Sequence, residues 1–133
     1  MTTSAQNLCL PIVFLNGKTM PIEDAKISPL DRGFIFGDGV YEVIPYYDGR
    51  GLRAREHLVR LQQSMDALYM TNPYSITEWE AIISDLIAQN GGGNIAVYIQ
   101  VTRGVAKRDF SPRRASPECT PQYYRRRFSR LGR

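Results

Sequence analysis

The sequence has few of the residues that build redox, metal or acid–base sites. Two cysteines, Cys9 and Cys119, lie near opposite ends of the 133 residues without CxxC spacing. Neither a disulfide framework nor a zinc site is therefore indicated. The single histidine, His57, has no second histidine with which to form an acid–base pair. We expect His57 to be satisfied locally on a helix.

Long apolar segments are also missing. No uninterrupted apolar run approaches the roughly 18 residues that suggest a membrane span. The N-terminal residues 1–17 carry no basic segment ahead of their short apolar run, so they do not resemble a signal peptide. With 43% hydrophobic and 23% charged residues, the composition is typical of one compact soluble domain. We expect a cytoplasmic protein without a membrane partner.

The charge is unevenly distributed along the chain. Residues 1–110 carry ten Lys or Arg against twelve Asp or Glu, a net of −2, whereas residues 111–133 carry seven Arg and one Glu, a net of +6. The second segment also has three prolines and no Lys, Ile, Val or Met. Since it has little with which to build a core, we expect it to be disordered, and we place a domain boundary at residue 110.

The first 110 residues alternate between strand and helix patterns. Residues 10–16 are expected to form a strand, Asn16-Gly17 a type I′ turn, and Thr19, Met20 and Ile22 the returning strand. Glycines break residues 31–39, and the β-branched run 40–44 predicts a strand that Pro45 should push toward a sheet edge or a bulge.

Two amphipathic helices follow. Apolar residues recur at helical spacing over 55–70, including Leu68, and a second helix is expected behind a capping box of Thr77 and Glu80. The apolar run 95–102 favours a central strand buried on both faces. These elements together predict an α+β domain.

Three motifs carry a family resemblance. In order, they are DRGFIFGDGVYEV (31–43), EHLVRL (56–61) and YIQVTRG (98–104). Over residues 12–110 the chain resembles the small N-terminal domain of fold-type IV, pyridoxal-phosphate-dependent aminotransferases, most of all D-amino acid aminotransferases. The resemblance implies an antiparallel or mixed sheet with two helices, and a homodimer in the full-length form.

The resemblance also implies roles for individual residues. Arg60 matches the arginine that holds the cofactor phosphate, a task suited to the fixed donors of a guanidinium. Without its motif, Arg60 would be interpreted as a solvated helix arginine. Tyr41 matches a tyrosine that faces substrate and cofactor, although strand propensity alone would place it in the core, and Val43 would share its face. Arg108 matches an arginine that binds the substrate carboxylate, but Phe110 stands where a histidine commonly assists.

The lysine needed for transamination is not recognised in this sequence. Lys18, Lys26 and Lys107 are its only lysines, and none matches the position that forms the Schiff base in the family. The resemblance implies that this lysine lies in a larger C-terminal domain. We therefore expect a fragment of a D-amino acid transaminase that has no catalytic residue of its own and is inactive alone.

Alternatives remain for substrate and tail. Branched-chain aminotransferase and aminodeoxychorismate lyase belong to the same family, and Arg103 is assigned to structure or to a dimer interface. For residues 111–133 we weigh an ordinary solvated terminus, a nucleic-acid-binding arm that combines arginines with Tyr123, Tyr124 and Phe128, and a shift of the coding frame just after Phe110. We favour the frame shift because it accounts at once for the change of charge and the loss of periodicity.

Overall fold

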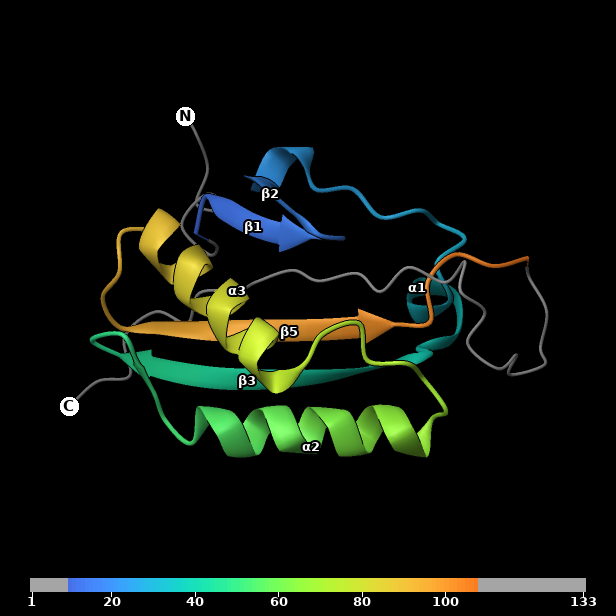
Figure 1. Cartoon of the computed structure of the whole chain (residues 1–133). Coiled ribbons are helices and arrows are strands. Elements are labelled where there is room, and N and C mark those ends of the chain that lie inside the picture. Colours follow the sequence, from blue (N-terminus) through green and yellow to red (C-terminus); the bar gives the residue numbers. More distant parts are fainter. Residues whose placement is uncertain (1–9, 108–133) are drawn as a thin grey trace.

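The computed structural model describes residues 10–107 as an α+β unit (Figure 1). All its strand pairs are antiparallel, and they form a two-stranded sheet, β1-β2, and a three-stranded sheet in the order β4-β3-β5. The predicted fold class is confirmed. In chain order the elements are β1 (Ile12–Leu15), β2 (Lys18–Pro21), η2 (Ile22–Asp24), α1 (Arg32–Phe36), β3 (Gly39–Tyr47), β4 (Arg50–Gly51), α2 (Ala54–Ala67), α3 (Ile76–Gln89) and β5 (Ile95–Thr102).

The opening hairpin forms where the sequence predicts it. Asn16 and Gly17 both have positive φ, 49° and 86°, between the paired residues Leu15 and Lys18. A two-residue loop of this kind needs positive φ at both positions, which asparagine and glycine tolerate best. The returning strand is shorter than predicted, because Ile22 already begins the 3-10 turn η2.

The main core lies between one face of the large sheet and the two long helices. Ile44 and Tyr46 of β3 alternate with residues of the other face, and Ile95, Val97, Ile99 and Val101 of β5 lie opposite this strand on the same face. Residues of α2 and α3 complete the cluster, among them Leu58, Leu61, Met65, Trp79, Ile83 and Ile87. Helix α2 runs alongside β3, and α3 also contacts β1 (Figure 1).

Strand β5 differs from its prediction as a central strand. Within residues 10–107 it pairs only with β3, and its buried residues alternate with partly exposed ones. One face of β5 is therefore in the core and the other is only half covered. The strand length agrees with the prediction, but a run rich in apolar residues does not by itself reveal how many neighbours a strand has.

Pro45 lies inside β3 and shows how a proline is accommodated there. Its carbonyl accepts a hydrogen bond from Leu52 N at 2.8 Å, on the side away from β5. Since the N and C=O of one strand residue point to the same side, the missing N–H faces away from the β5 ladder. Over Gly39–Pro45, β3 has no strand paired on that side among the described residues. Pro45 thus lies where the unpaired edge of β3 meets the short strand β4, and the pairing register with β5 has no bulge there.

Both long helices are confirmed, with differences at their ends. Helix α2 ends at Ala67, so Leu68 is 38% exposed and not on the apolar face, and Tyr69 adopts a positive φ of 54°. The capping box of α3 is formed by Ser75 and Glu78, two residues before the predicted pair. Within residues 10–107, no helix combines the length and apolar character needed to cross a membrane.

Candidate functional site

Arg60 is held at the surface by a buried carboxylate. Its Nε and Nη2 donate to Glu42 Oε1 and Oε2 at 2.6 and 2.8 Å. His57, one turn earlier on α2, places Nδ1 2.8 Å from Glu42 Oε2. Glu42 is 3% exposed on the helix-facing side of β3, whereas the Arg60 side chain is 64% exposed. His57 is therefore satisfied locally, as predicted, and it shares its partner with Arg60.

The charge state of Glu42 follows from these contacts. Burial alone would raise the pKa of Glu42, but the hydrogen bonds and positive charge that Arg60 and His57 provide outweigh burial and lower this pKa below its ordinary value. An ionised carboxylate only accepts hydrogen bonds, so we assign the proton of the short contact to His57 Nδ1. Glu42 thus forms a charged, three-bonded anchor beneath the helix.

Tyr41 and Val43 lie on the other face of β3, because they alternate with Glu42. Tyr41 is 65% exposed and stacks on Tyr98 of β5, with ring centroids 5.7 Å apart. Val43 is directly opposite Tyr98 in the strand register. The structure therefore brings Tyr41 and Val43 together on one face, while Arg60 is anchored from the opposite face.

Arg60 is paired with the carboxylate of Glu42, which directly follows Tyr41 in β3. Hydrogen bonds from Arg60 to Glu42 are the main cause of the raised pKa of Arg60, and Tyr41 adds a smaller electrostatic contribution. At Tyr41 and Val43, no described strand pairs with β3 on the side away from β5.

A cavity of about 390 Å³ adjoins the face that carries Tyr41. It is lined by residues 27–29, by Asp31, Gly33 and Phe34 around α1, and by Gln100 and Thr102 of β5. Gln100 accepts a hydrogen bond from the Tyr98 hydroxyl at 2.9 Å and so links the cavity to the Tyr41–Tyr98 pair. Tyr98 and Gln100 were not singled out from the sequence, although their alternation within YIQVTRG indicates that they share a face.

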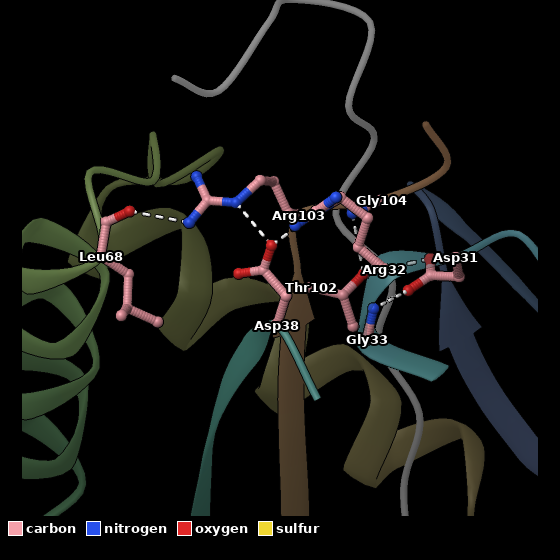
Figure 2. Close-up of polar contacts among 8 residues, drawn as sticks. All are labelled: Asp31, Arg32, Gly33, Asp38, Leu68, Thr102, Arg103 and Gly104. Carbon is pink, nitrogen blue, oxygen red and sulfur yellow. Dashed lines mark hydrogen bonds and ion pairs between the residues drawn. The ribbon is translucent and has the colours of Figure 1, made fainter. Parts of the chain in front are cut away.

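A second polar cluster fixes the loop around α1 (Figure 2). Arg32 and Arg103 each donate from Nε to Asp38 Oδ2 at 2.8 Å, and Arg103 Nη2 donates to the Leu68 carbonyl. Both guanidinium groups are buried, with 6% and 4% of the side chains exposed. Burial alone would raise the pKa of Asp38, but the bonds from Arg103 and Arg32 lower it. Arg103 is therefore structural, in line with one of its two predicted roles.

Asp31 joins the start of α1 to the end of β5. Its carboxylate accepts from Gly33 N at 2.8 Å as the helix cap and from the Thr102 hydroxyl at 3.1 Å. A Cβ at Gly33 would lie only 2.3 Å from Thr102 Cγ2, so glycine is required for this approach. The glycine-rich stretch thus contains a five-residue helix, and its motif residues mainly build the platform beside the cavity.

Arg108, the predicted carboxylate-binding residue, lies outside the described residues, as do Cys9, Cys119 and residues 111–133. Lys18, Lys26 and Lys107 are exposed, and none of them lines the cavity. Within residues 10–107, no cluster of His, Cys, Asp and Glu is suited to a metal ion.

The comparison with known families decides what this scaffold is. The model of the amino-transferase class IV family matches residues 39–127, two thirds of the chain. This chain belongs to the class IV aminotransferase family. The family match extends past residue 110, where we place the domain boundary; that boundary stays a prediction.

Individual members of the class IV family are also similar to this chain in sequence. A D-alanine aminotransferase of Staphylococcus epidermidis is 41% identical over 99 residues, which are 74% of this chain and 35% of the relative. One from Listeria monocytogenes is 42% identical over 93 residues, 70% of this chain and 32% of the relative. The chain therefore spans about a third of the length of the curated relatives it matches.

Solved structures of the family share the fold. The branched-chain aminotransferase of the thermophilic archaeon Thermoproteus uzoniensis, with norvaline, aligns with a TM-score of 0.65 at 25% identity. The alignment covers 78% of this chain and 35% of that one. The Escherichia coli branched-chain enzyme aligns at 0.70 and 21% identity, over 86% and 39% of the two chains. At such identities the likeness is evidence for the fold and not for the substrate.

Proposed function

We propose that residues 10–107 are the small-domain part of a D-amino acid aminotransferase, which exchanges an amino group between a D-amino acid and a 2-oxo acid. The main support for this proposal is that buried Glu42 holds Arg60 in one orientation. Tyr41, which precedes Glu42 in β3, is exposed. The 41% identity to a D-alanine aminotransferase favours a D-amino acid over a branched-chain substrate.

The residues present fit one part of pyridoxal 5'-phosphate. Arg60 would contact the phosphate, because its Nη1 has no partner among the described residues and its side chain is largely exposed. When bound, the cofactor supplies the electron sink that makes the substrate α-carbon acidic. Tyr41 and Val43 would line the substrate side, and we propose Arg108 for the substrate carboxylate.

The same residues do not fit covalent attachment of the cofactor. None of the three lysines lines the cavity, and each is exposed. We therefore propose that this polypeptide is inactive by itself. Purified chain treated with pyridoxal 5'-phosphate and borohydride should show no specific adduct, and D-alanine with 2-oxoglutarate should give no pyruvate. A stoichiometric adduct on one lysine together with turnover would refute this.

A chimera tests the proposed activity directly. Residues 10–107 would replace the matching segment of the Staphylococcus epidermidis D-alanine aminotransferase. We expect pyruvate from D-alanine, and little reaction with L-leucine or L-valine. Preference for the branched-chain substrates would favour the alternative within the family. A folded, cofactor-loaded chimera without activity on either class would contradict the proposal.

Further proposals concern assembly and the remaining chain. We propose that the full-length protein is a cytoplasmic homodimer, which sedimentation of the full-length protein can test. For residues 111–133 we propose a coding-frame shift just after Phe110, and an undisrupted reading frame in the locus would overturn it. If the arginine-rich segment instead binds nucleic acid, deletion of 111–133 should abolish salt-dependent RNA binding.

A further inference from the structure

Glu42 is a buried carboxylate on an otherwise apolar strand face. Its neighbours along that face, Ile44 and Tyr46, belong to the hydrophobic core, and Glu42 itself is 3% exposed. A buried charge is costly unless it is paired and hydrogen-bonded, and an apolar residue could fill the same space. The packing of β3 against α2 therefore does not by itself require a carboxylate at this position.

The contacts of Glu42 constrain one side chain above all. Both its oxygens bind the Nε and Nη2 edge of Arg60, at 2.6 and 2.8 Å. His57 Nδ1 contacts Oε2 and thereby fixes the carboxylate on a second side. A guanidinium has five donors in a rigid plane, so occupation of this edge leaves the edge that contains Nη1 directed away from Glu42.

We infer that Glu42 is a positioning residue that holds the Arg60 guanidinium with its Nη1 edge free for the phosphate of the cofactor. This inference rests on the proposed phosphate contact of Arg60. It adds that the orientation of Arg60 is built before a phosphate arrives, with His57 as the second support of the carboxylate.

Arg55 provides the matched comparison on the same helix. Its Nη1 lies 3.6 Å from Glu80 Oε1, and the two side chains are 69% and 39% exposed. The Arg55 contact is longer and involves an exposed carboxylate, so it should hold the guanidinium weakly. We therefore expect the Nε–H hydrogen of Arg55 to exchange rapidly with solvent. Arg55 and Glu80 thus serve as controls in the same molecule.

Two effects of Glu42 on phosphate binding oppose each other. Its negative charge offsets that of Arg60 and would weaken the attraction for an anion, whereas its two hydrogen bonds fix the guanidinium and would favour binding. Glu42→Gln removes the charge and one of the two acceptor oxygens while keeping the size. If neutralisation dominates, this variant binds phosphate more tightly. If positioning dominates, it binds more weakly.

The first measurement needs no substitution. In the 133-residue chain, NMR can follow hydrogen exchange of the Nε–H groups of Arg60 and Arg55. We expect markedly slower exchange at Arg60 than at Arg55. Equal rates would show that Glu42 does not hold the guanidinium and would overturn the inference even if a Glu42 variant failed to fold.

The second measurement is a titration with pyridoxine 5'-phosphate, which has the phosphate but no aldehyde that could react with lysines. Binding should perturb the Arg60 Nε–H signal. Glu42→Gln should lower the affinity for pyridoxine 5'-phosphate about tenfold, as expected for loss of a hydrogen bond to a charged group. Arg60→Lys keeps the charge without the two-point contact and should weaken binding similarly. Glu80→Gln should leave binding unchanged.

The outcomes separate this inference from the proposed function. Equal or tighter binding by Glu42→Gln would overturn the positioning role while Arg60 remained a phosphate contact. Slow Arg60 exchange without any response to pyridoxine 5'-phosphate would instead overturn the phosphate role of Arg60, and with it the proposed function, while the Glu42–Arg60 contact itself would stand.

Discussion

Within residues 10–107, the arginine–carboxylate clusters around Asp38 and Glu42 differ in how far their arginines are exposed. Around Asp38, the side chains of Arg32 and Arg103 are 6% and 4% exposed, and the carboxylate is 13% exposed. Around Glu42, the carboxylate is 3% exposed and Arg60 is 64% exposed. A buried arginine donates its hydrogen bonds to the protein itself. An exposed arginine that is held by a buried carboxylate keeps other donors available for a ligand. The first arrangement stabilises the fold, and the second prepares a binding group.

The largest effect is expected from Asp38→Ala. The change leaves Arg32 and Arg103 buried without their shared carboxylate, and breaking a buried pair typically costs about 3–5 kcal/mol. Chemical denaturation should show a loss of this size or an unfolded chain. Asp85→Ala, which removes an exposed carboxylate bonded to Gln89 on the same helix, is the control and should change stability little. A loss for Asp38→Ala no larger than that of the control would contradict the structural role of the cluster.

Gly33→Ala should have the next largest effect, because the added Cβ would meet Thr102 Cγ2 at 2.3 Å. Overpacking of this kind costs about 1–3 kcal/mol. Thr102→Ser removes the methyl group and keeps the hydroxyl that donates to Asp31. The double variant should recover part of the lost stability, as measured by a double-mutant cycle. Additive losses would show that the contact with the methyl group does not limit the site.

Acid should weaken both clusters. The pKa values of Asp38 and Glu42 are lowered in the folded chain from ordinary values of 3.8 and 4.5. Each carboxylate therefore contributes stability above its unfolded pKa, and this contribution is lost as the pH falls through the folded pKa. We expect the unfolding free energy to fall as the pH drops below about 4.5, and the fall to be shallower in Asp38→Asn and Glu42→Gln. Parallel acid curves for wild type and variants would argue against ionised pairs.

Local chemistry made part of this fold predictable. The Asn16-Gly17 turn and the two long helices follow from residues close in sequence. The capping box was ambiguous, since Ser75–Glu78 and Thr77–Glu80 have the same spacing. The earlier pair forms, and it lets Ile76 pack on the core while Trp79 donates to Asn72. The two capping-box patterns are equivalent in sequence, and tertiary packing determines that Ser75–Glu78 is the one that forms.

The partners of the site arginines could not be predicted in the same way. Glu42 and Arg60 are 18 residues apart, and Arg103 and Asp38 are 65 apart. Each pairing depends on how β3 lies against α2 or β5, which no local pattern specifies. The motifs identified Arg60 and Tyr41 through resemblance, but only the folded chain shows which arginine is buried and which is exposed.

The smallest effect on stability and phosphate binding is expected from Arg55→Ala. This variant is the reference against which Arg60→Ala is compared. Arg55 pairs with Glu80 across 3.6 Å at the surface, and exposed pairs contribute about 0–1 kcal/mol. Stability and binding of pyridoxine 5'-phosphate should both remain close to wild type. Arg60→Ala, on the same helix and similarly exposed, should weaken phosphate binding and also destabilise the fold, because it leaves buried Glu42 with His57 alone. If denaturation and titration gave the same result for both variants, the buried carboxylate would not distinguish Arg60 from an ordinary surface arginine.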